Sequence, residues 1–221
     1  MRRSLFAFTI FTLVLGYFTF DEVRALTRPL PATPPEVTRD VIVKSATDFL
    51  GRRASFRILL FSDEFRWRIN SEDALLGEPG RPNFTAEMKA VLNDAREIIC
   101  IGASSEEIPA GVSFAAGRLA EERRAGRRAE QIAKWVREGL SRPVPVRKLN
   151  VGHHAPTGTG GQDTSDQRRV VIVLVLDYDA YTNIDQALRA AMSRESARAP
   201  IFETLLTRYS LSSREEFVWV P

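Results

Sequence analysis

Residues 118–136 read RLAEERRAGRRAEQIAKWV, a stretch with five arginines in its first eleven residues. An α-helix turns by about 100° per residue, and this spacing places a set of apolar residues within about 60° of Ala125. We therefore expect a helix over residues 115–140. Its buried stripe should consist of Ala125, Ala129, Ile132, Val136 and Leu140.

The arginines divide between two sides of this helix. The pole opposite the stripe is charged and solvated, and it carries Arg123, Arg127, Glu130 and Lys134. Arg124 and Arg128 instead border the stripe, so their stems can lie on the core edge while the guanidinium groups reach adjacent loops. A planar guanidinium in that position suits bidentate capture of a carboxylate. The alternative is that Arg128 pairs with Glu121 or a loop carboxylate.

The segments around this helix have the patterns of strands and of further helices. Seven consecutive apolar residues within 168–178 predict a strand at the centre of a sheet. Thr85 is expected to cap a helix over 86–96. Other strands are expected over 56–69 (or a hairpin), 97–104 and 143–152, and further helices over 184–194 and 201–209, followed by an edge strand at the C-terminus.

This order of elements predicts an α+β fold. Its core is β-α-β-α-β-β, with the helices on one face of a small mixed sheet, and a C-terminal helical extension follows. We expect four parts in the chain. Residues 1–25 are a targeting segment, residues 26–50 a proline-rich linker and lead-in, residues 51–180 the domain, and residues 181–221 the C-terminal extension.

The N-terminus has the composition of a targeting segment. Arg2 and Arg3 precede an apolar run over residues 5–20, and acidic residues follow it. Basic residues before the run and acidic residues after it direct the chain out of the cytoplasm. Residues 1–25 are therefore either a cleaved signal peptide or an inner-membrane anchor. In both cases we expect the following proline-rich segment and domain to be periplasmic.

Composition and spacing argue against several classes of function. The net charge is only +3, and arginine and glutamate are interleaved, so nucleic-acid binding is not expected. The single cysteine, Cys100, lies in an apolar run, as a buried residue would. Adjacent His153 and His154 point to opposite sides of an extended chain, so no metal or other cofactor is expected. No nucleophile-base arrangement is legible, so we do not expect an enzyme.

Four segments in this order resemble the OmpA/MotB-type peptidoglycan-associated domain. They are FTAEMKAVLNDAREIICIGAS, RRAEQIAKWVREGL, VRKLNVGHHAP and DQRRVVIVLVL, which lie between residues 84 and 176. The resemblance rests on the Arg128-Ala129 pair, on Gly152 at a strand end and on the motif Gln167-Arg168-Arg169-Val170. The chain is thus similar to a divergent member of a family that binds the diaminopimelate residue of peptidoglycan.

The resemblance implies a set of ligand-binding residues. In the family, an aspartate binds the ligand ammonium group and the helix arginine binds its carboxylate. Arg128 corresponds to that arginine, but Ser105 stands in place of the aspartate. Glu106 and Glu107 follow at once as candidate substitutes, whose reach differs from that of the aspartate. Of these two, Glu106 belongs to the expected set. Arg124 and Arg169 complete the expected set. The expected function is non-catalytic attachment to peptidoglycan. The alternative is an envelope protein-protein interaction scaffold that has kept the fold and lost the ligand.

Overall fold

The computed structural model describes residues 40–61, 65–76, 84–108, 110–157, 164–193, 200–212, 214 and 216–221. The expected signal peptide or anchor lies outside these ranges, as do residues 26–39 of the lead-in and residues 158–163 of the glycine-rich loop. Among the described helices, none combines the length and the apolar character that a membrane span requires.

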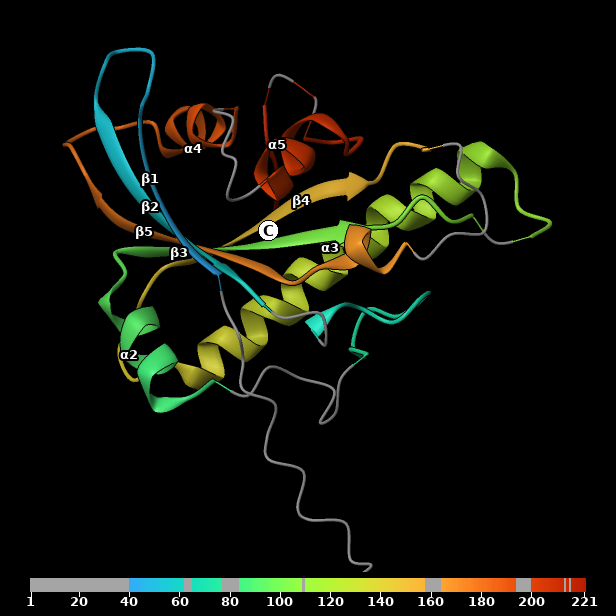
Figure 1. The fold of residues 1–221 in the computed structure, drawn as a ribbon, viewed down its shortest axis with the longest axis horizontal. Helices are drawn as coiled ribbons and strands as arrows, with labels where there is room; N and C mark the ends of the chain where they lie inside the picture. The colour runs from blue at the N-terminus through green and yellow to red at the C-terminus, as the bar shows by residue number, and fades with distance from the viewer. Residues whose placement is uncertain are drawn as a thin grey trace, which may run out of the picture. The chain divides into compact units, whose positions relative to one another are not determined.

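A mixed sheet forms the centre of the fold, with the strand order β1-β2-β5-β3-β4-β6 (Figure 1). β3 and β4 are parallel, and every other neighbouring pair is antiparallel. The strands are β1 (Asp40–Thr47), β2 (Arg53–Leu60), β3 (Glu97–Ser104), β4 (Val146–His153), β5 (Val171–Tyr178) and β6 (Val218–Val220).

The apolar run expected at the centre of the sheet is there. It forms β5, which lies between β2 and β3 and buries residues 171–175 completely or nearly so. β1 was not expected, because its residues fall in the lead-in that follows the proline-rich segment. It forms a hairpin with β2, in which Thr47 is paired with Arg53. The sheet therefore begins before residue 51.

Helices cover both faces of the sheet (Figure 1). α2 (Ala86–Asp94) and α3 (Phe114–Gly139) pack on one face, as expected for the core. The C-terminal helices α4 (Ile184–Ser193) and α5 (Pro200–Thr207) pack on the other. The predicted order is thus confirmed as β2-α2-β3-α3-β4-β5 in an α+β fold. The extension provides a second layer of helices.

The long helix α3 has the faces that its spacing predicts. Four residues of the expected stripe are fully buried, and the charged outer pole is exposed. Trp135 is also nearly buried, because its ring stacks on Trp67 with centroids 5.3 Å apart. Trp67 belongs to a segment after β2, residues 65–76, which packs against α3 on this face of the sheet. That segment determines the surroundings of Arg128.

Candidate functional site

A close approach of α3 to β3 positions the candidate site. Gly102 lies near the C-terminal end of β3, and a Cβ there would come within 1.9 Å of the Ala125 carbonyl oxygen. It would also come within 2.5 Å of the Ala129 backbone nitrogen. Only glycine therefore lets the helix lie this close to the strand. The result is that Arg128 sits directly over the end of β3.

Arg128 is fully buried and holds three parts of the chain together. Its Nη1 donates to the Ala103 carbonyl at 2.8 Å, which belongs to β3. Its Nε donates to Ser71 O at 2.8 Å and its Nη2 to Arg68 O at 3.2 Å. The guanidinium also lies 5.4 Å from the centre of the Trp67 ring. Arg128 thus reaches adjacent loops, as expected, but its partners are backbone carbonyls rather than Glu121 or a loop carboxylate.

The electrostatic state of Arg128 reflects this burial. Loss of solvent lowers its pKa to about 9, and the positive charges of Arg124 and Arg168 act in the same direction. The side chain still carries its proton at neutral pH. A buried cation needs hydrogen-bond acceptors, and the three carbonyls supply them. A ligand carboxylate would have to displace these acceptors in order to bind the same guanidinium.

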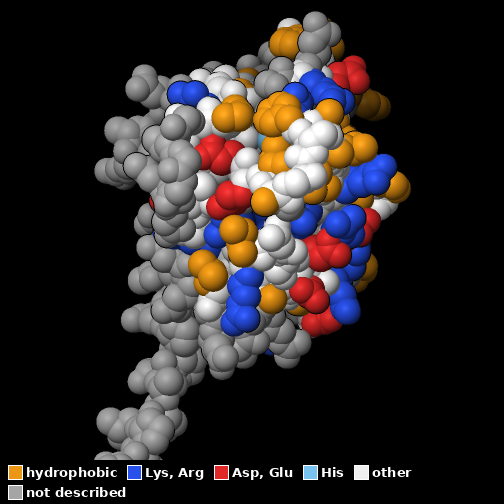
Figure 2. Space-filling model, turned by 90° about the vertical axis from the view of Figure 1, so that its right-hand side faces the viewer, with side chains coloured by type: hydrophobic (Ala, Val, Ile, Leu, Met, Phe, Trp, Pro, Cys, Tyr) orange, Lys and Arg blue, Asp and Glu red, His pale blue; other side chains and the backbone are white. Residues whose placement is uncertain are grey.

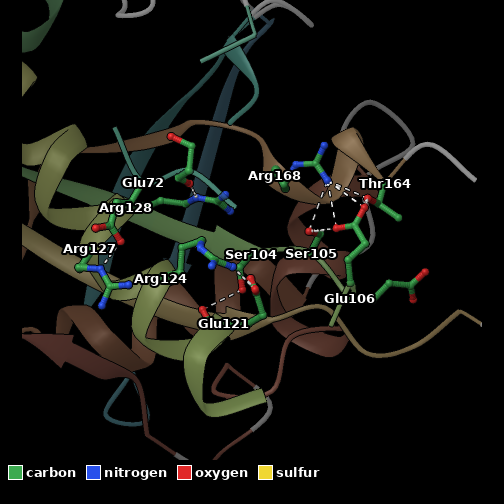
Figure 3. Close-up of polar contacts among 12 residues, drawn as sticks. Glu72, Ser104, Ser105, Glu106, Glu121, Arg124, Arg127, Arg128, Thr164 and Arg168 are labelled. Atoms are coloured by element: carbon green, nitrogen blue, oxygen red, sulfur yellow. Dashed lines mark hydrogen bonds and ion pairs between the residues drawn. The ribbon is translucent and has the colours of Figure 1, made fainter. Parts of the chain in front are cut away.

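Arg124 is engaged with its own helix. It forms an ion pair with Glu121, one turn earlier, and the Glu121 side chain is almost fully buried. Burial lowers the pKa of Arg124, and the neighbouring charge of Arg127 lowers it further. Ser104 Oγ donates to the Glu121 carbonyl at 2.9 Å. This contact joins the end of β3 to the first half of α3 (Figure 3).

Ser105 follows β3 directly and belongs to a polar cluster with Glu107, Thr164 and Arg168, which we call the β3-end cluster. Figure 3 labels three of its members, Ser105, Thr164 and Arg168. Both hydroxyls donate to the Glu107 carboxylate. Arg168 Nη1 lies 3.1 Å from each oxygen of that carboxylate and 2.8 Å from Thr164 Oγ1. The cluster therefore combines a carboxylate, a guanidinium and two hydroxyls.

The solvent exposure of this cluster is uneven. The Arg168 side chain is 6% exposed, whereas that of Glu107 is 32% exposed. Arg168 Nε also donates to the Trp67 carbonyl at 3.0 Å, which ties the cluster to the segment 65–76. The Arg168 guanidinium is therefore held by the segment 65–76, and the Glu107 carboxylate is the more accessible of the two groups. This arrangement can contact a ligand cation through Glu107 without exposing Arg168 completely.

On the sequence alone, Glu106 and Glu107 are both candidate substitutes for the aspartate, and Glu106 is the one expected at the site. Arg168 is named there only within the family motif, with Arg169 expected at the site, and Thr164 is not named. The Glu106 carboxylate accepts from Thr157 Oγ1 at 2.8 Å, away from Ser105. Arg169 pairs with Asp166 at 2.6 Å. Side chains two residues apart on extended backbone point to the same side. That spacing, counted from Ser105, would have favoured Glu107 over Glu106.

The serines and histidines near the ends of β3 and β4 have defined surroundings. The Ser104 hydroxyl donates to the Glu121 carbonyl, and the Ser105 hydroxyl donates to the Glu107 carboxylate, which itself pairs with Arg168. Burial lowers the pKa of both His153 and His154, which favours their neutral forms. Within the described ranges, no group of three or more His, Cys, Asp or Glu residues is arranged to hold a metal ion.

The surface around the ends of β3 and β4 is of mixed charge. Figure 2 looks onto this end of the molecule and shows Lys and Arg side chains interspersed with Asp and Glu. Apolar side chains lie between them. The face in view therefore lacks the continuous basic surface that a nucleic-acid backbone requires.

Comparison with known proteins finds similarity at the level of solved structures alone. No protein-family model matches the chain, and no curated protein matches it. The cell wall anchor of the T6SS from Pseudomonas aeruginosa is 14% identical, with 74% of this chain and 97% of that chain covered at a TM-score of 0.31. The OmpA-like domain of FopA1 from Francisella tularensis subsp. tularensis SCHU S4 is 12% identical, with 68% and 94% covered at a TM-score of 0.31. At such scores neither likeness bears on the chemistry of the site, which rests on the contacts described above.

Proposed function

We propose that this chain is a non-catalytic protein of the cell envelope that binds peptidoglycan at the β3-end cluster. The observation that carries the proposal is the Glu107 carboxylate, which folds back onto Ser105. A carboxylate is thereby present where Ser105 replaces the aspartate of the family that the sequence resembles. It is the group that an ammonium ligand needs for a charge-assisted hydrogen bond.

The proposed ligand is the zwitterionic end of a diaminopimelate residue. Its ammonium group would contact Glu107, with Ser105 and Glu106 alongside, and its carboxylate would approach Arg168. Arg128 takes a supporting role here, because its guanidinium is buried under the segment 65–76 and donates to three carbonyls. Arg124 and Arg169 would add positive charge around the ligand rather than direct contacts, since both are paired with neighbouring carboxylates.

The test is co-sedimentation of the full chain with purified peptidoglycan sacculi, with Glu107→Gln and Arg168→Lys beside the wild type. Each variant should bind at least tenfold more weakly, because each loses a charge or a planar donor pair. Free diaminopimelate should compete, and 1,5-diaminopentane, which has ammonium groups but no carboxylate, should compete poorly. Glu72→Gln is the matched control, since Glu72 pairs with Arg127 on the outer face of α3. Circular dichroism establishes that each variant is folded.

A second function is favoured by one specific observation. The Glu107 carboxylate is already paired with Arg168, and the Arg128 guanidinium already donates to three backbone carbonyls, so these charged groups have their partners within the protein. This is what an envelope protein-protein interaction scaffold would retain after losing the ligand. Failure of the folded wild type to sediment with sacculi would overturn the peptidoglycan proposal and support the scaffold.

A further inference from the structure

The end of the sheet opposite the β3-end cluster carries three large apolar side chains in solvent. Phe49 is 88% exposed, Leu50 75% and Tyr181 90%, and among the large hydrophobic side chains whose burial the structure describes, the next most exposed reaches 55%. Phe49 and Leu50 lie in the β1–β2 turn, and Tyr181 lies in the loop from β5 to α4. We call these three residues the apolar tip.

Strand directions place the apolar tip and the β3-end cluster far apart. β2 and β3 both run antiparallel to β5, so they run in the same direction. The apolar tip precedes the first residue of β2, whereas the cluster follows the last residue of β3. Eight-residue strands separate the two by roughly 25 Å at about 3.3 Å per residue. In Figure 1 the β1–β2 turn projects beyond the sheet at the upper left.

One carboxylate holds the two loops of the apolar tip together. Asp48 Oδ1 accepts from the backbone nitrogens of Leu50 at 2.9 Å and of Arg52 at 3.0 Å. Asp48 Oδ2 accepts from Arg52 Nε at 2.7 Å and from the Asn183 backbone nitrogen, in the other loop, at 3.0 Å. The backbone beneath the exposed side chains is therefore fixed, and their exposure does not come from a loose turn.

The backbone of the apolar tip includes unfavourable conformations. Gly51 has φ +79°, which glycine adopts freely, but Tyr181 has φ +62°. A large L-residue at positive φ costs about 1 kcal/mol or more and is kept where the surroundings enforce it. Here the strain directs a tyrosine into solvent, which contributes nothing to the core. Such a residue is best explained by something that it contacts outside the chain.

The shape and charge of the apolar tip indicate its partner. Exposure of 75–90% means that each side chain projects from a convex turn, and a flat protein surface cannot cover such a projection. A lipid bilayer can accommodate such a projection without a preformed pocket. Aliphatic and aromatic side chains then lie at the acyl boundary, and a tyrosine lies at the level of the headgroups. Two neighbouring pairs of opposite charge are joined, Arg52 with Asp48 and Arg96 with Asp177, and the Asp179 carboxylate accepts from the Arg53 backbone nitrogen. This suits insertion driven by apolar burial.

If residues 5–20 anchor the chain in a bilayer, the apolar tip lies within linker length of that bilayer. The apolar run over residues 5–20 is expected to be a signal peptide or an anchor, and nineteen residues separate it from the start of β1. Extended chain covers at most about 3.4 Å per residue, so this segment can span roughly 65 Å. An anchored chain can therefore bring the apolar tip to the bilayer that holds its own N-terminus.

We propose that the apolar tip inserts into the interface of a phospholipid bilayer. This is a second binding surface, independent of the peptidoglycan proposal, at the other end of the sheet. It would let one domain contact a membrane through one end and a second partner through the other. Because the apolar tip is fixed by Asp48, it should insert without rearrangement of the fold.

The experiment places an environment-sensitive fluorophore beside the apolar tip of the full chain, through Ala180→Cys. The native Cys100 is fully buried and should not react with the label. Vesicles of phosphatidylethanolamine and phosphatidylglycerol should shift the emission to the blue, and spin-labelled lipid should quench it. Vesicles of phosphatidylcholine should give a similar shift, because the neighbouring charges are paired. The same label at Glu130, on the outer face of α3, should not respond.

Variants connect the signal to the apolar tip. Phe49→Ser together with Leu50→Ser should reduce the blue shift at least fivefold, whereas the matched pair Phe114→Ser and Leu119→Ser, elsewhere on the surface, should leave it unchanged. This readout does not depend on whether residues 5–20 also bind the vesicles. An unchanged emission at position 180 in the presence of vesicles would overturn the proposal. A blue shift that appears without vesicles as protein concentration rises would overturn it too, in favour of a second copy of the chain.

Discussion

The two ends of the sheet differ in which kind of side chain they bury and which they expose. At the C-terminal end of β3, two arginines are almost fully buried: Arg168 pairs with Glu107, and Arg128 donates to backbone carbonyls. At the β1–β2 turn, apolar groups are held out in solvent by one buried carboxylate, that of Asp48. The first end stabilises the fold through groups that look functional. The second end keeps apolar side chains in solvent, where they do not stabilise the core. Mutations at the two ends should therefore have contrasting effects.

The largest effect is expected at Arg128. Arg128→Met keeps much of the side-chain volume but leaves the carbonyls of Arg68, Ser71 and Ala103 without this donor. We expect a loss of about 3–5 kcal/mol in the free energy of unfolding, measured by urea titration. Arg123→Met, on the exposed pole of the same helix, should change it by less than about 0.5 kcal/mol. Similar values for the two variants would mean that Arg128 does not hold the segment 65–76.

Arg168 should have a smaller effect. Arg168→Met removes the partner of Glu107 and the donor to the Trp67 carbonyl, and a loss of about 1–3 kcal/mol is expected. Arg127→Met provides the comparison, because Arg127 and its partner Glu72 are both more than 40% exposed. Exposed pairs contribute about 0–1 kcal/mol. An equal loss for both arginines would show that burial of the β3-end cluster does not matter for stability.

The contribution of Asp48 to stability should be present at neutral pH and lost in acid. Burial raises the pKa of Asp48, but its four hydrogen bonds outweigh this and lower the pKa from 3.8 to about 2. A carboxyl whose pKa is lower in the folded state stabilises the protein above its unfolded pKa, and this contribution is lost as the pH falls. Wild-type stability should therefore decrease between about pH 4 and pH 2. Thermal unfolding of Asp48→Asn should show a lower midpoint at neutral pH and a flatter profile across that window. If the midpoints of the wild type and of Asp48→Asn fall in parallel between pH 4 and pH 2, another group causes the acid sensitivity.

A small gain is expected at Tyr181. Tyr181→Gly relieves the positive φ, and the side chain buries almost nothing in the free protein. The free energy of unfolding should rise by about 0.5–1 kcal/mol. Membrane insertion should weaken in the same variant. A destabilised Tyr181→Gly protein would show that the tyrosine makes contacts that stabilise the fold.

The smallest effect is expected from the Phe49→Ser and Leu50→Ser pair. Both side chains are mostly exposed, so the unfolding free energy should change by less than about 0.5 kcal/mol. The same double variant should lose the vesicle response described above. Equilibrium unfolding of the pair beside the wild type separates the two outcomes. A large loss of stability would mean that these side chains are part of the core after all.

The sequence by itself determined the periodic features of the protein. The spacing of Ala125, Ala129, Ile132 and Val136 predicts the buried face of α3, because helical geometry allows one arrangement of such residues. The apolar run of β5 predicts a central strand, and Thr85 caps α2 by accepting from the Met88 backbone nitrogen at 3.2 Å. The order of these elements is enough to predict the α+β class. Each of these features depends on neighbours within a few residues.

The tertiary structure alone decided which polar groups meet. Glu107, Thr164 and Arg168 come together across some sixty residues, and Arg128 meets the carbonyls of a segment almost as distant in sequence. The same is true of the apolar tip, since Asp48 and Asn183 are joined across 135 residues. No local pattern encodes these contacts, because they depend on how the sheet orders its strands. The sequence therefore determined which faces are buried, and the packing of distant loops determined what each end of the sheet can bind.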